Sequence, residues 1–142
     1  MTSQSNAIIS KLSESGQTIT PASDDIRGLT VKDKDGKKLG KVLDLLIDDE
    51  ARKVRFMLVE HGGFLGFGDT KSFIPVDDIT KITADDVFIN HTAEHVAVAP
   101  RYDPDLDLVA ARDYHSKVYG HYGYLPFWGM GYAYPTVYSG GI

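Results

Sequence analysis

Residues 39–48 read LGKVLDLLID and decide the fold, because they form one long run of strand-forming residues that ends in acidic turn residues. Alternation along a strand predicts that Leu43, Leu45 and Ile47 share one face. Gly40 lies early in this run, where a glycine predicts a bulge or a bend that lets a sheet curl. Apolar residues fall on both faces, as expected for a strand that is covered on two sides.

Shorter strands are predicted on either side of this run. One covers residues 29–31, and the Asp35-Gly36 pair that follows it is a hairpin signal. Pro75 must lie at a strand end or a sheet edge, because proline donates no ladder hydrogen bond. The remaining strands are predicted at residues 53–60, 71–76, 79–82 and 87–90. We therefore expect an all-β fold: a small antiparallel barrel of five to six strands, with short helices and an aromatic, Gly-rich C-terminal tail.

Composition divides the chain into three segments. Residues 1–22 are rich in Ser and Thr and are predicted to be a flexible leader, in which Ile19 could fix the chain onto a sheet edge. Residues 23–103 form the expected barrel domain. Residues 104–142 are predicted to be a helix followed by the tail, and residues 118–142 contain no Asp, Glu, Lys or Arg.

Two helices are expected after the strands. The first covers residues 92–98 and begins at Thr92, whose hydroxyl suits an N-cap. The second covers residues 107–119, where apolar side chains recur at helical spacing. Gly120 is the expected C-cap of this second helix.

The overall composition excludes several classes of protein. The chain has no cysteine, which excludes disulfides, thiolate metal sites and cysteine nucleophiles. Its formal net charge of -5 at pH 7 argues against a protein held to nucleic acid by bulk charge. The N-terminus lacks a basic segment followed by an apolar run, so no signal peptide is predicted and a cytoplasmic location is expected. The uncharged tail is too rich in Gly, Pro and Tyr to predict a transmembrane segment.

Residues 91–95 spell H-x-x-E-H, a pattern in which two histidines and a glutamate serve zinc chemistry. A catalytic zinc needs a third protein ligand, and no glutamate follows Glu94 in the chain. His91 also precedes the expected N-cap, so the two imidazoles are not expected to align. The Gly-rich residues 62–68 lead into a strand rather than a helix, which argues against a phosphate loop. We expect no catalytic residue, no cofactor and no metal.

A series of short motifs runs through the strand region in this order: DIRG at 25–28, LGKV at 39–42, DLLID at 44–48, KVRF at 53–56, GGFLG at 62–66 and IPV at 74–76. The series resembles the PRC-barrel domain. That family includes the cytoplasmic domain of the photosynthetic reaction centre H subunit and the C-terminal domain of ribosome maturation factors. The resemblance covers about residues 23–103, and the tail is similar to that of a free-standing bacterial subgroup of the family.

This resemblance implies an interaction or assembly module without shared catalytic residues. We expect a non-enzymatic protein that works through protein–protein contacts, either with a partner protein or by self-association. One alternative is a ribosome- or RNA-associated maturation-type factor, for which the lysines of residues 32–41 offer a small positive stripe. The other is a membrane-peripheral component related to the H subunit.

The Gly-rich loop and the aromatic tail are the predicted contact surface, because amphipathic aromatic rings suit interfaces. Two arrangements stay open: the tail wraps its own barrel, or it binds another molecule. Trp128 is the expected anchor, and a chain cut after Asp103 is expected to stay folded while losing the contact. The candidate surface consists of Phe64, Leu65, Phe67, Tyr122, Tyr124, Phe127, Trp128, Tyr132 and Tyr134.

The first testable prediction concerns the histidine pair. Replacing His91 and His95 together by Gln is expected to leave the metal content of the purified protein near zero, as in the wild type, because the sequence offers no third ligand. Elemental analysis of both proteins checks this. Stoichiometric zinc in the wild type that disappears in the double variant would contradict the prediction.

Overall fold

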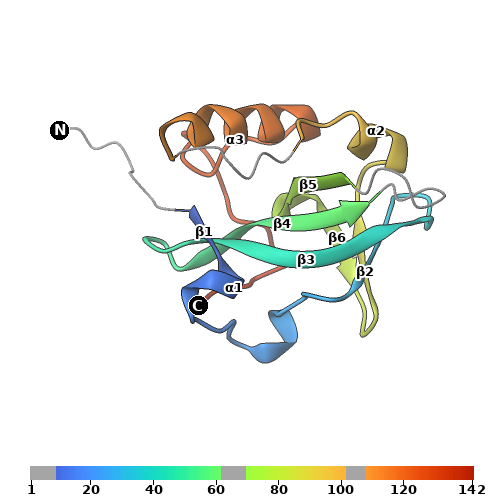
Figure 1. Cartoon of the computed structure of the whole chain (residues 1–142), viewed down its shortest axis with the longest axis horizontal. Helices are drawn as coiled ribbons and strands as arrows, with labels where there is room; N and C mark the ends of the chain where they lie inside the picture. Colours follow the sequence, from blue (N-terminus) through green and yellow to red (C-terminus); the bar gives the residue numbers. More distant parts are fainter. Residues whose placement is uncertain (1–8, 62–69, 102–107) are drawn as a thin grey trace.

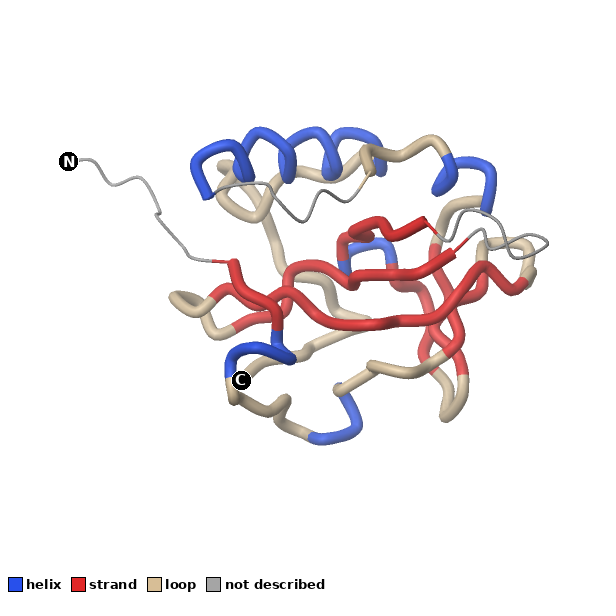
Figure 2. Tube along the Cα trace, in the orientation of Figure 1, coloured by secondary structure: helices blue, strands red, loops and turns tan. Residues whose placement is uncertain are grey.

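The computed structural model describes residues 9–61, 70–101 and 108–142, and the side chains of 108–110 are outside that description. A curled sheet lies at the centre, with the long helix α3 along one side of it (Figure 1). The short helix α1 and the C-terminus lie together on the opposite side (Figure 2). The sheet is therefore covered on two sides, which explains the apolar residues on both faces of its longest strand.

Within the described residues, seven strands form one sheet. Its hydrogen-bonded order is β5-β4-β3-β2-β7-β6, and β1 pairs with β3 beside this path. The strands are β1 (Ile9–Lys11), β2 (Thr30–Lys32), β3 (Lys38–Asp48), β4 (Lys53–His61), β5 (Thr70–Pro75), β6 (Ile79–Ile82) and β7 (Asp86–Ile89). The predicted strands are confirmed within a residue or two at each end, and Pro75 ends β5 as expected.

The sheet is mixed, which corrects the expectation of an antiparallel barrel of five to six strands. All pairs are antiparallel except β2 and β7, which run parallel. The cause is the path of the chain after β5. The single-turn helix η3 (Val76–Asp78) carries it to β6 at the far end of the sheet, and the β6–β7 hairpin then brings β7 alongside β2 in the same direction. This return of the chain curls the sheet into a half-barrel.

Bulges in β3 overturn the simple alternation expected for residues 39–48. Val42 pairs with Val59 and Asp44 with Leu58, so Leu43 is an extra residue on β3. Leu43 consequently points outward and is 37% exposed, whereas the alternation places it on the buried face with Leu45 and Ile47. A further register shift adjoins Gly40, as predicted from the glycine.

Gly40 is required by the close approach of β4. A Cβ atom built on Gly40 would collide with the backbone carbonyl of Glu60 on the neighbouring strand. Any side chain at this position would push the two strands apart, so the glycine permits the curl of the sheet.

Residues 9–12, at the start of the described chain, lie on the sheet, whereas the first eight residues of the predicted flexible leader are outside the described residues. Strand β1 pairs with the end of β3, and helix α1 (Leu12–Ser15) follows it directly. Leu12 and Ile19 are both buried, and the Thr20 backbone bridges to Gly141. Ile19 is therefore a buried point of attachment, although the bridge beside it pairs with the C-terminal residue Gly141 and not with a strand at the sheet edge. A further single-turn helix, η1 (Ala22–Asp24), leads into the domain.

Both predicted helices are present. Helix α2 (Ala93–Ala97) begins after Thr92, whose hydroxyl accepts a hydrogen bond from the His95 N–H at 3.1 Å, as an N-cap does. Helix α3 (Leu108–Tyr122) runs past Gly120, which corrects the predicted C-cap. Gly123 follows the helix with φ of 83°, so the left-handed residue that ends α3 is this later glycine.

Phe56 lies at the centre of the core, where the sheet meets α3. Its ring is fully buried and contacts Phe73 on β5 and Tyr119 on α3, with ring centroids 5.9 and 5.0 Å apart. The same ring stacks on His115 at 4.8 Å. Elements from the middle and from the C-terminal part of the sequence therefore converge on one aromatic side chain.

Phe56→Ala is expected to lower the free energy of unfolding by about 3–5 kcal/mol, because it leaves a cavity that these neighbours cannot fill. Urea denaturation followed by circular dichroism measures the loss. Leu43→Ala on the adjacent strand is the matched control, and we expect it to cost less than about 1 kcal/mol because Leu43 is outside the core. Equal losses in the two variants would contradict this assignment of the core.

Candidate interaction surface

The C-terminal tail, residues 123–142, packs on its own barrel. It turns back along α3, with the Tyr124 N–H donating to the Tyr119 carbonyl at 3.0 Å. It then crosses to β4, where the Tyr134 hydroxyl donates to the Val54 carbonyl at 2.9 Å, and its last residues are tied to the domain. The Gly141 carbonyl accepts from Thr20 N–H at 2.9 Å, and Ile142 N–H donates to the Arg52 carbonyl at 3.1 Å. Of the two arrangements left open by the sequence, the structure shows the intramolecular one.

The side chain of Arg55 on β4 holds the tail against the barrel. Only 7% of this residue is exposed, and its Nη2 and Nε donate to Asp48 Oδ2 at 3.0 and 3.2 Å. Its guanidinium carbon lies over three rings of the tail, 4.4 Å from the Phe127 centroid and 5.7–5.8 Å from those of Tyr134 and Tyr132. A buried cation is attracted by the faces of aromatic rings, so the charge neutralised by Asp48 also holds the tail.

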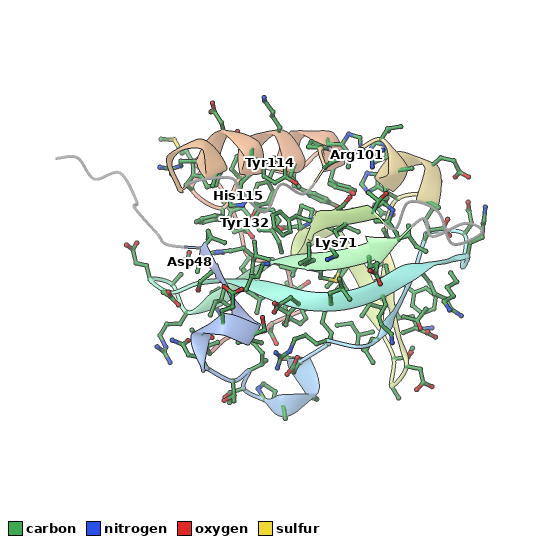
Figure 3. All side chains as sticks on the ribbon, in the orientation of Figure 1. Asp48, Lys71, Arg101, Tyr114, His115 and Tyr132 are labelled. Atoms are coloured by element: carbon green, nitrogen blue, oxygen red, sulfur yellow. The ribbon has the colours of Figure 1, made fainter. Side chains whose placement is uncertain are left out.

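Tyrosine hydroxyls add directional contacts. Tyr132 donates to Asp77 Oδ2 at 2.9 Å, and Tyr124 donates to Asp78 Oδ1 at 2.6 Å. Both acceptors lie on η3, and burial raises the pKa of each of these two carboxyl groups. Further along, Tyr138 is fully buried and donates to the Asp24 carbonyl at 2.8 Å. Figure 3 shows Tyr132 in the layer between α3 and the sheet.

The structure divides the predicted contact residues into three groups. Tyr122 is 2% exposed and belongs to the core. The other candidate residues of the tail are half-buried. Tyr132 contacts Arg55 and Asp77, and the rest pack against the core, namely Tyr124, Phe127, Trp128 and Tyr134. The loop residues Phe64, Leu65 and Phe67 are outside the described residues.

Trp128, the expected anchor for a partner, has its contacts within the chain. Its ring meets Tyr119 edge-on at 6.1 Å, and the Arg112 guanidinium lies 4.5 Å from its centroid. The tail and α3 also supply Val118 and Tyr138 to the same core as the sheet. A chain cut after Asp103 would lose these core residues, so the structure argues against the expectation that it stays folded.

The large apolar side chains that the tail exposes are Leu125, Met130 and Val137, which are 53%, 98% and 50% exposed. Leu125 and Met130 flank one turn, in which Gly129 N–H donates to the Pro126 carbonyl at 2.8 Å and Gly129 lies against Leu125. We call Leu125, Trp128 and Met130 the tail ridge. The sequence analysis did not include Leu125 and Met130, because it selected contact residues in this segment by their aromatic side chains. The sequence did contain a sign of their exposure: where an aromatic ring packs inward, the residues next to it face solvent.

The histidine and glutamate side chains of the H-x-x-E-H pattern contact other groups of the protein. His91 Nδ1 lies 2.6 Å from Asp78 Oδ1, and His95 Nε2 lies 2.7 Å from the carbonyl of His121. Glu94 is exposed and faces Lys37. Within the described residues, no group of three or more His, Asp or Glu side chains is arranged to hold a metal ion.

The predicted lysine stripe is partly neutralised by acidic residues. Lys32 pairs with Asp86 at 3.7 Å, and Lys37 pairs with Glu94 at the same distance.

A serine and a histidine also lie within hydrogen-bond distance of each other. His61 Nε2 on β4 and Ser72 Oγ on β5 are 2.8 Å apart. A nucleophile must be reachable by substrate, and Ser72 is only 1% exposed. We therefore interpret this hydrogen bond as a structural contact between β4 and β5.

Comparison with known proteins identifies the domain. A family model for the PRC-barrel domain matches residues 22–96, which is more than half of the chain. The chain belongs to the PRC-barrel family. The match begins at η1 and ends within α2, so β1, α1, α3 and the tail lie outside the matched residues. No curated protein matches the chain. No helix in the described ranges is both long and apolar enough to cross a membrane.

Arg55→Ala is expected to lower the free energy of unfolding by about 3–5 kcal/mol, because it leaves the Asp48 charge buried without its partner and removes the cation beneath the tail rings. Urea denaturation measures the loss, and Trp128 emission should shift to the red as the tail loosens. Lys41→Ala on the exposed face of β3 is the control, with an expected change below about 0.5 kcal/mol. A loss in Arg55→Ala no larger than in this control would contradict the proposed anchoring.

Proposed function

We propose that this PRC-barrel protein is a non-enzymatic interaction module that works through protein–protein contacts at the tail ridge. The observation that carries the proposal is the position of Met130. Two consecutive turns, closed by Gly129 N–H to the Pro126 carbonyl and by Tyr132 N–H to the Gly129 carbonyl, hold this methionine 98% exposed. A flexible thioether side chain adapts to differently shaped partners, which suits a contact residue.

The ridge rests on a rigid base. Trp128 packs between Arg112 and Tyr119, and Phe127 lies on the buried Arg55 guanidinium. Because these rings are already ordered, a partner that docks here does not have to order them, and the entropic cost of binding is reduced. The apolar tip on a preorganised base supports a docking role.

A non-enzymatic role is supported by the use of the titratable side chains. Asp48 is paired with Arg55, and Asp77 and Asp78 accept hydrogen bonds from tail tyrosines. These carboxylates hold the tail to the barrel instead of facing a cleft, whereas catalytic acids and bases must reach a substrate. The partner at the tail ridge is then either a cytoplasmic protein or a second copy of the chain.

The test is capture of partner proteins by the full-length chain from its own host, followed by affinity measurement with the purified partner. We expect a double change of Leu125 and Met130 to Asp to weaken that affinity at least tenfold, because charge would be buried at the contact. Val98→Asp is the matched control, since Val98 is a 74% exposed aliphatic residue at the end of α2, and it should leave the affinity unchanged.

Salt dependence and lipid binding distinguish the alternatives from this proposal. Association that is insensitive to salt and survives nuclease treatment supports an apolar protein contact. Binding of RNA that falls steeply with salt would favour the ribosome-associated alternative. Co-sedimentation with anionic vesicles would favour the membrane-peripheral one. Either result, with an unchanged affinity in the Leu125/Met130 double variant, would overturn the proposed function.

A further inference from the structure

The sulfur of this chain is confined to three methionines, because the chain has no cysteine. Met57 lies on β4 and is fully buried, Met130 lies in the tail and is 98% exposed, and Met1 is outside the described residues. Thioethers and thiols are the side-chain groups that oxidants convert stepwise and, at the first step, reversibly. Among the described residues, the sulfur that an oxidant in solution can reach is therefore that of Met130.

Met130 lies at the corner of a type II turn. The turn runs from Gly129 to Tyr132, and the Tyr132 N–H donates to the Gly129 carbonyl at 3.1 Å. Gly131, the third residue of the turn, has a φ of 86°, as this position requires, whereas the φ of Met130 is not positive. The backbone conformation of the turn therefore fixes the methionine at its outer corner.

The residues on both sides leave the thioether open to solvent. Gly129 and Gly131 have no side chains that could shield it, and a Cβ atom built on Gly131 would meet nothing within 4 Å. The preceding residue, Trp128, turns the other way and packs against Tyr119 and Arg112. A small oxidant and the active site of a repair enzyme can both approach the Met130 sulfur without any movement of the tail.

The reaction expected at this sulfur is a two-electron oxidation by a peroxide. A lone pair of the thioether sulfur attacks one oxygen of hydrogen peroxide, so an S–O bond forms and the O–O bond breaks. The other oxygen leaves with both hydrogens as water. Sulfur is oxidised and peroxide is reduced, and the side chain becomes methionine sulfoxide, which methionine sulfoxide reductases return to the thioether.

The sulfoxide would change the surface of the tail without changing its fold. The turn is closed by backbone groups, and the Met130 side chain makes no part of the buried core, so oxidation removes no core contact. What changes is polarity. An apolar tip next to the turn that carries Leu125 becomes a polar group, and a partner would have to remove water from it on docking.

We propose that Met130 is a reversible oxidation site, which peroxides convert to the sulfoxide in preference to Met57 and whose oxidation weakens docking at the tail ridge. The effect on docking rests on the proposed function, whereas the selective oxidation rests on the exposure of the two methionines. The class of reaction that must consume the product is reduction by a methionine sulfoxide reductase.

The first test is oxidation of the full chain by dilute hydrogen peroxide, followed over time by peptide mapping with mass spectrometry. We expect the sulfoxide of Met130 to form at least about tenfold faster than that of Met57, because burial hinders the reaction. The map also separates Met1 from both. Equal rates at Met57 and Met130 would overturn the proposal.

Reversal and stability are measured on the same oxidised protein. A mixture of the two stereospecific classes of methionine sulfoxide reductase, with a dithiol reductant, should restore the Met130 thioether. Urea denaturation should give the same midpoint before and after oxidation, because the core is untouched. A sulfoxide that the reductases leave unchanged, or a lowered midpoint, would contradict a reversible surface site.

The second test is the affinity of the oxidised protein for the purified partner, with each protein compared with its own untreated form. We expect oxidation to weaken binding about tenfold in the wild type and equally in Met57→Leu, which keeps the oxidisable tip. Met130→Leu carries an apolar side chain that peroxide does not oxidise, so treatment should not change its affinity. A loss in treated Met130→Leu equal to that of the wild type would overturn the proposal, as would an unchanged affinity of the oxidised wild type.

This inference and the proposed function fail in different ways. If the change of Leu125 and Met130 to Asp weakens binding but oxidation does not, the regulation is overturned and the proposed function stands. If the Asp variant binds as tightly as the wild type, the proposed function is overturned together with the regulation of docking. The peptide map decides in either case whether Met130 is a selective oxidation site.

Discussion

The contact on which the C-terminal half of this PRC-barrel protein depends is the buried guanidinium of Arg55. Asp48 neutralises it at the end of β3, and its faces are then free to hold Phe127 and two tyrosine rings. A cation of this kind is costly to bury, and the cost is offset only when both the carboxylate and the rings are in place. The ion pair within the sheet and the docking of the tail are therefore one coupled arrangement.

This coupling explains why the uncharged, glycine-rich tail does not leave its aromatic rings exposed to solvent. Left in water, the rings of residues 123–142 would invite association. On the barrel, the hydroxyls of Tyr124 and Tyr132 reach the two carboxyl groups of η3, and Tyr138 is enclosed beside Asp24. Leu125 and Met130 stay exposed on the docked tail, and they are the basis for the proposed contact surface.

Three of the histidines lie where α3 meets the barrel and α2. A helix laid over a barrel needs side chains that fill space and also meet backbone carbonyls, and a neutral imidazole does both. His115 fills space against Phe56, while His95 and His121 each donate to a carbonyl of the other's helix. Helix α3 is held to the barrel by these imidazole contacts and by the buried side chains of Val118, Tyr119 and Tyr122.

Sequence alone determined the strand positions, the glycine bend near Gly40, the Thr92 cap and the family, because each depends on local pattern. It also located the unusual tail. Tertiary structure decided three things that local pattern cannot contain. The parallel pairing of β2 with β7 depends on where the chain returns, and the outward turn of Leu43 depends on a bulge against β4. The inward packing of the tail aromatics depends on Arg55, a charge nearly eighty residues away in sequence whose burial only the folded chain reveals.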